Sequence, residues 1–94
     1  MTQSIRDFWG FLQQCEARLN KEASEVQSDA EMKTLISRWL NPNSGVLEQM
    51  KDDPFLALAK PTARQIFIDT MRNRVQQVEQ EWEEVRRSLY EPES

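Results

Sequence analysis

Apolar residues recur every seven positions in two long stretches of the chain, and this spacing predicts two long amphipathic helices. The first pattern covers residues 4–27 and the second covers residues 63–90. Seven residues make about two turns of an α-helix, so each series returns to one face and forms a continuous stripe. The residues that mark the two stripes are Ile5, Leu12, Leu19 and Val26 in the first, and Ile68, Val75, Trp82 and Leu89 in the second. Helices of these lengths would be roughly 36 and 42 Å long.

A third, shorter helix is predicted over residues 29–40, where apolar residues follow one another at steps of three and four. Ser28 and Glu31 have the spacing of a capping box at its start, in which the two residues satisfy free backbone N–H groups. The stretch Asn41–Gly45 predicts a turn, because a residue before proline disfavours the helical conformation. The middle of the chain therefore contains one clear helix with defined ends.

Residues 46–60 predict short helical turns, with Asp53 as an N-cap before a proline at the first helical position. The stretch Thr62–Gln65 has the form of a second capping box. The apolar stretch Ile66–Ile68 spreads over about 200° of helix surface, so the start of the last helix should be enclosed. The residues expected to cover it are Trp39, Leu40, Phe55, Leu56 and Leu58.

Together these elements predict an all-α fold, a small helical bundle in one domain over residues 1–94 with frayed ends at 1–3 and 91–94. The two long helices are expected to pack antiparallel or in a shared seam. The stretch Arg64–Val78 broadly resembles the third helix of N-terminal domains in some SNARE proteins. Amphipathic helices of unrelated origin share that pattern, so the resemblance implies no fold, partner or site residue here.

Charge and composition narrow the possible partners. The 94 residues include 12 Lys and Arg against 16 Asp and Glu, a net charge of −4, and no basic cluster. Because nucleic-acid binding depends on clustered cations at phosphates, we expect no nucleic-acid partner. No apolar run approaches the roughly 20 residues that cross a bilayer, so we expect no membrane span. Without a signal-peptide pattern at the start, a cytoplasmic location is the expectation.

The inventory of reactive side chains argues against an enzyme. The chain has no histidine, which removes the commonest general base and metal ligand. Cys15 lies on the apolar face of the first helix and is expected to be a buried, inert thiol. The glutamates of residues 79–84 lie outside the stripe and read as a solvated face, so neither a metal nor another cofactor is expected. We therefore expect a protein that is not an enzyme.

Aromatic residues are the best candidates for a functional surface, because indole and phenol rings are enriched at protein interfaces. Trp9, Phe11 and Tyr90 are the predicted interface residues, with Glu79 and Glu83 as a polar rim. The 12-residue middle helix is also too short to cover the full length of the two long helices, so part of their apolar stripe is left uncovered at one end. The favoured function is a non-enzymatic protein–protein interaction module, such as an adaptor, chaperone, inhibitor or regulatory subunit. The alternative is a structural homo-oligomer, at its simplest a homodimer, that assembles through its long helices.

Overall fold

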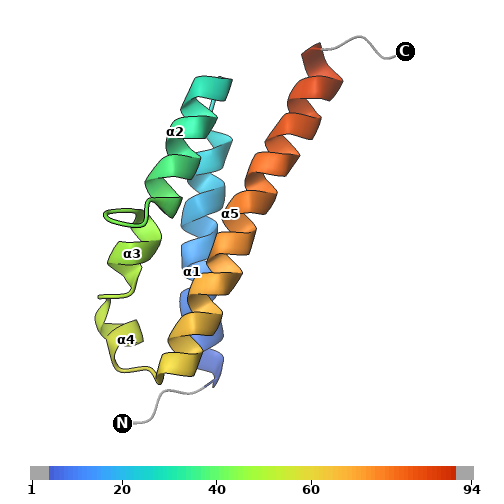
Figure 1. The fold of residues 1–94 in the computed structure, drawn as a ribbon. Coiled ribbons are helices and arrows are strands. Elements are labelled where there is room, and N and C mark those ends of the chain that lie inside the picture. Colours follow the sequence, from blue (N-terminus) through green and yellow to red (C-terminus); the bar gives the residue numbers. More distant parts are fainter. Residues whose placement is uncertain (1–4, 91–94) are drawn as a thin grey trace.

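The computed structural model describes residues 5–90, which form five helices and no strand (Figure 1). The helices are α1 (Ile5–Ser24), α2 (Asp29–Leu40), α3 (Val46–Met50), α4 (Pro54–Ala57) and α5 (Pro61–Tyr90). The predicted all-α bundle is confirmed. The ends at 1–3 and 91–94, predicted to fray, lie outside the described residues, and so does the side chain of Tyr90.

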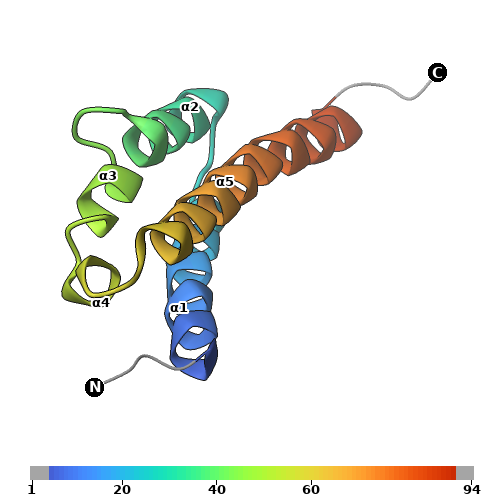
Figure 2. The same cartoon turned by 60° about the horizontal axis from the view of Figure 1, so that its bottom comes forward.

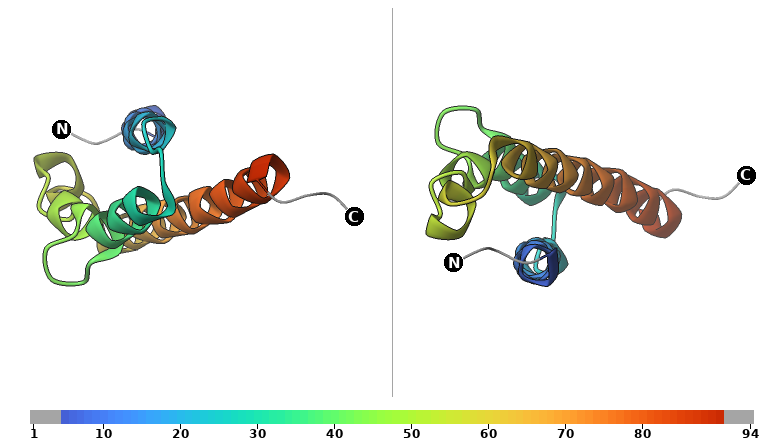
Figure 3. Two further views of the ribbon diagram at one scale, coloured as in Figure 1. Left: turned by 90° about the horizontal axis from the view of Figure 1, so that it is seen from above. Right: turned by 90° about the horizontal axis from the view of Figure 1, so that it is seen from below.

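The chain runs up in α1, returns through α2, α3 and α4 together, and runs up again in α5 (Figure 1). The two long helices are therefore parallel, and the antiparallel alternative is wrong. The physical reason is the length of the middle segment, which carries the chain back to the level at which α1 begins. In Figures 2 and 3, α5 is inclined to α1, and α2 packs against both. We call the end where α1 and α5 begin the lower end, and the opposite end the upper end.

The core lies along the seam between α1, α2 and α5, where the predicted stripes meet. Leu12 and Leu19 from α1 and Ile68 and Val75 from α5 are all buried there. The largest fully buried side chains are Trp39, Phe67, Leu19, Leu56, Met71 and Val75. The bundle measures 57 × 27 × 20 Å. Figure 1 shows α5 continuing past the tops of α1 and α2 at the upper end.

The connection between α1 and α2 begins earlier than predicted. Helix α1 ends at Ser24, whereas the predicted helix extends to residue 27. The Glu25 and Val26 N–H groups bond to carbonyls three residues back, at 3.3 and 3.2 Å, so the last turn tightens before the chain leaves the helix. Ser28 is extended at φ −150° and ψ 162°, which a continuous helix would forbid.

The capping box of α2 forms as predicted, with one difference in its partners. The Ser28 hydroxyl accepts a hydrogen bond from the Glu31 N–H at 3.2 Å. The Glu31 carboxylate accepts from the Gln27 N–H at 2.6 Å, one residue before the usual partner in this motif. The two hydrogen bonds thus fix the start of α2 and also Gln27, the residue just before its N-cap.

The turn after α2 requires a glycine at position 45. The Asn41 side-chain oxygen accepts from the N–H groups of Asn43 and Ser44, at 2.8 and 3.3 Å. Gly45 is buried, and a Cβ at this position would lie 2.5 Å from the backbone carbonyl oxygen of Asn41 and 2.7 Å from its backbone nitrogen. The close approach of the backbone, at an ordinary negative φ, is therefore what requires glycine.

Proline positions set the starts of α4 and α5. The Asp53 side chain accepts from the Phe55 N–H at 2.9 Å, which confirms the predicted N-cap of α4. Helix α5 begins at Pro61, and the Lys60 carbonyl accepts from the Arg64 N–H at 3.1 Å. The capping box predicted over residues 62–65 is wrong, because these residues already lie inside the helix that proline starts.

The start of α5 is enclosed only in part. Phe67 and Ile68 are buried, whereas Ile66 is 52% exposed. Among the residues expected to cover this region, Leu56 is fully buried but Leu58 is 82% exposed. Successive helical residues point about 100° apart, and the neighbouring elements cover only two of these three directions. The prediction of full enclosure is wrong at Ile66 and Leu58.

Candidate functional site

The apolar stripe of α5 continues past the part of the helix that the bundle covers. Val78 is buried against α1 and α2, but Val85 and Leu89 are 52% and 69% exposed. Trp82 lies at the boundary, where it is half-buried. The uncovered stripe that the helix lengths predicted is therefore present, and it lies at the upper end.

Trp82 is held in place by the first residue of α2. Its indole N–H donates to the Asp29 carboxylate at 2.7 Å, and the Arg86 Nε lies 3.2 Å from the same oxygen. Asp29 also lies in the first turn of α2, where the helix dipole favours a negative charge. One carboxylate thus ties α2 to two successive turns of α5.

A mostly apolar groove of about 270 Å³ lies on one side of Trp82, between the end of α1 and α5. We call it the apolar groove. Its lining residues are Asn20, Ala23, Ser24, Met32, Val78, Glu81, Trp82 and Val85. The exposed stripe of α5 forms one of its walls, so the groove and the stripe make one continuous surface.

A second, more polar groove of about 170 Å³ lies on the other side of Trp82, between α2 and α5. We call it the polar groove. Its lining residues are Asp29, Met32, Lys33, Glu79, Trp82, Glu83 and Arg86. The structure therefore brings the predicted rim residues Glu79 and Glu83 together, beside an aromatic residue that the sequence analysis did not select.

The other predicted interface residues lie elsewhere. Trp9 is on α1 at the lower end and is 54% exposed. Phe11 is half-buried, with its ring stacked on Phe55 at 4.8 Å between centroids and tilted against Phe67 at 5.2 Å. Since α1 begins at the opposite end of the molecule, neither residue lies near the polar groove (Figure 1). The predicted surface is thus divided between the two ends, and the role of each residue in an interface stays a prediction.

Trp82, Val85 and Leu89 were missed as site residues although they lie on the predicted stripe. The signal was in the sequence: the stripe extends to Leu89, while the predicted cover from the middle helix is only 12 residues long. What the sequence did not indicate is which end of α5 stays uncovered. That depends on the parallel arrangement of α1 and α5.

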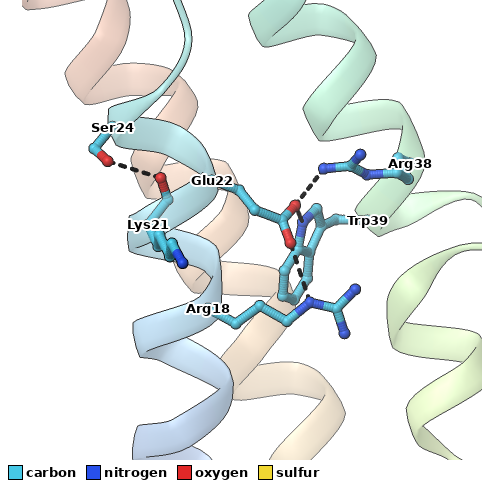
Figure 4. Close-up of polar contacts among 6 residues, drawn as sticks. All are labelled: Arg18, Lys21, Glu22, Ser24, Arg38 and Trp39. Carbon is cyan, nitrogen blue, oxygen red and sulfur yellow. Dashed lines mark hydrogen bonds and ion pairs between the residues drawn. The ribbon is translucent and has the colours of Figure 1, made fainter.

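Glu22 forms the most highly connected polar cluster among the described residues (Figure 4). Its carboxylate accepts from the Trp39 indole N–H and the Arg18 Nε, each at 3.0 Å, and from Arg38. Partial burial raises the pKa of Glu22, but the hydrogen bonds from Trp39 and Arg18 and the charge of Arg38 outweigh it, so the pKa is lowered. The bonds to Trp39 and Arg38 join α1 to α2. Because its oxygens already accept these hydrogen bonds, the Glu22 carboxylate is poorly placed to act as a base.

Cys15 is buried in the core, as predicted, and is 7% exposed. Burial, together with the negative charge of Asp53, raises the pKa of its thiol to about 11. The reactive thiolate is therefore scarce at neutral pH, and reagents reach the sulfur poorly.

Within the part of the chain that the structure describes, no group of His, Cys, Asp and Glu side chains is arranged to hold a metal ion. None of the described helices is long and apolar enough to cross a membrane. Comparison of the chain with protein-family models, curated proteins and solved structures gives no match. The surface around Trp82 is thus selected as the candidate site by its geometry alone.

Proposed function

We propose that the protein is a non-enzymatic helical module that binds another protein through its upper end. The observation that carries the proposal is the exposed pair Val85 and Leu89, which continues a buried helical stripe beside the apolar groove. Exposed apolar surface next to polar rims is typical of protein interaction sites. An adaptor, chaperone, inhibitor or regulatory subunit acting in the cytoplasm would use such a surface.

The side-chain chemistry supports a binding role over a catalytic one. The sequence has no histidine, the thiol of Cys15 is buried, and the Glu22 carboxylate is occupied by its neighbours. A binding module needs none of these groups to react. It needs a folded scaffold and an exposed apolar surface, and the described residues provide both.

Affinity capture from a lysate of the cells that make the protein tests the proposal. The bait is the wild-type chain, compared with the double variant Val85→Asp and Leu89→Asp. Both residues are exposed, so the variant should keep its circular dichroism spectrum and lose the partner. A matched control, Ile5→Asp and Leu58→Asp, changes two exposed residues at the lower end and should keep it. Loss of the partner only in the control would contradict the proposal.

A structural homo-oligomer remains the second candidate, because the lower end also exposes apolar side chains. These are Ile5, Trp9, Leu58 and Ile66. Contacts between unlike ends would be heterologous and would build open assemblies. Light scattering on the purified protein distinguishes the candidates: a concentration-dependent assembly abolished by changes at either end supports self-assembly, and a monomer supports a different partner.

A further inference from the structure

We infer that the surface around Trp82 accepts an amphipathic helix of a different protein, one whose apolar ridge is flanked by lysine and arginine. This inference rests on the proposed function and names the chemistry of the partner. It is argued from the shape of the exposed stripe and from the charges on its two sides.

The shape favours a helix as occupant. Trp82, Val85 and Leu89 follow one another at steps of three and four, so they form a ridge along one face of α5. The same face, one turn earlier at Val78, is filled by the helices α1 and α2 of the chain itself. A helix with apolar residues at matching steps continues this packing, with its ridge seated in the apolar groove.

The charges favour a basic helix. Glu81 lines the apolar groove on one side of the ridge, and Glu79 and Glu83 line the polar groove on the other. All three side chains are exposed. The polar groove also contains Lys33 and Arg86, but Arg86 is paired with Asp29. Carboxylates therefore outnumber cations on both flanks, which matches lysine or arginine on both flanks of an incoming helix.

The same charges disfavour other occupants. A second copy of the chain would bring its own Glu79, Glu81 and Glu83 to the shared ridge, and like charges across an interface are repulsive. Of the two cations in its polar groove, Arg86 is already paired with Asp29, so Lys33 alone would face these three carboxylates. Anionic lipid surfaces and nucleic acids would be repelled by the carboxylates for the same reason.

Three designed peptides of about 18 residues, long enough to form a helix, test the inference directly. The first has a leucine stripe with lysine on both flanks, and the second has the same stripe with glutamate on both flanks. The third has the composition of the first in scrambled order, which removes the stripe. Fluorescence anisotropy with the full chain should show the lysine-flanked peptide binding at least about tenfold more tightly than either of the others. Added salt should weaken that binding.

Two variants locate the binding. Replacing all three carboxylates, Glu79→Gln, Glu81→Gln and Glu83→Gln, should reduce the preference for lysine over glutamate flanks to below about threefold. Val85→Ser with Leu89→Ser should abolish binding of every peptide. The matched control Ile5→Ser with Leu58→Ser, at the lower end, should change nothing. Circular dichroism checks that each variant is folded.

The outcomes separate this inference from the proposed function. Equal or tighter binding of the glutamate-flanked or scrambled peptide overturns the inference, and so does binding that survives loss of Val85 and Leu89. Failure of all three peptides also overturns it. If the lysate partner still depends on Val85 and Leu89 in that case, the proposed function stands with a partner of other chemistry. If the lysate partner is independent of both residues, the two proposals fail together.

Discussion

The two glycines of the chain lie in opposite steric surroundings, which predicts opposite effects of the same substitution. A Cβ at Gly45 would meet the Asn41 backbone at 2.5 Å, whereas a Cβ at Gly10, inside α1, has no neighbour within 4 Å. Gly45→Ala should lower the free energy of unfolding by about 1–3 kcal/mol, because the backbone around Asn41 must shift to make room for the Cβ. Gly10→Ala should raise it by about 0.5–1 kcal/mol, because alanine is the better helix former. Urea unfolding measures both, and a neutral Gly45→Ala would show that the turn has room to relax.

Cys15 should make the protein less stable as the solution becomes alkaline. Burial raises the thiol pKa from its usual 9.0 to about 11, so between these values the unfolded chain loses a proton that the folded chain keeps. The free energy of unfolding therefore falls as pH rises from about 9 to about 11. Other groups titrate in this range, so the measurement is the difference between wild type and Cys15→Ala across pH 8–11. A constant difference would mean that the thiol titrates normally in the folded protein.

Glu22 should contribute stability that acid removes. Its pKa is lowered from the usual 4.5, so the stabilisation is present above that value and is lost as pH falls through the lower value of the folded state. At neutral pH, Glu22→Gln should cost about 1 kcal/mol, a modest amount because solvent reaches the Arg18 and Arg38 partners. Acid titration of both proteins, followed by Trp fluorescence, should show the difference shrinking as the pH falls below 4.5. A difference that persists would assign the effect of Glu22 to packing.

At the scale of elements, the contact between Trp82 and Asp29 should control how firmly the upper part of α5 is held. Trp82→Phe keeps most of the ring but removes the indole N–H that donates to Asp29. The global stability should fall by only about 1 kcal/mol, because Asp29 is exposed and keeps Arg86 as a partner. Hydrogen exchange should accelerate in the first turn of α2 and after residue 82, and stay unchanged around Val75. Uniform acceleration would contradict a local role.

At the scale of the whole molecule, one heptad stripe should tolerate charge at one position and not at another seven residues away. Val78 is buried among three helices and Val85 is half exposed. Val78→Asp should unfold the protein, because burying an unpaired carboxylate costs several kcal/mol. Val85→Asp should keep a cooperative melt close to that of wild type. Thermal melts of both variants check this, and equal destabilisation would place the boundary of the bundle beyond Val85.

The sequence by itself determined where the helices lie and which face of each long helix turns toward the core. The stripes along α1 and α5, the capping box at Ser28 and the turn at Gly45 are local features. Each depends on residues a few positions apart, so spacing and side-chain chemistry suffice to predict them. The burial of Cys15 followed from its place on a stripe. The predictions were wrong at Thr62–Gln65 and at the end of α1, which are the start of one helix and the end of another. Pro61 begins α5 before the predicted capping box, and the connection to α2 ends α1 before its apolar stripe ends.

The tertiary structure alone decided the direction of α5, the end that remains uncovered and the residues that meet there. Glu79 and Glu83 become part of a groove only because α2 begins beside Trp82, an arrangement that links residues more than fifty positions apart. Phe11 is not among the residues that mark the stripe of α1, yet it packs against Phe55 from α4, a contact that no periodicity within α1 could show. Such contacts depend on how the middle segment returns the chain, and helical periodicity specifies a face of each helix but not the neighbour that covers it.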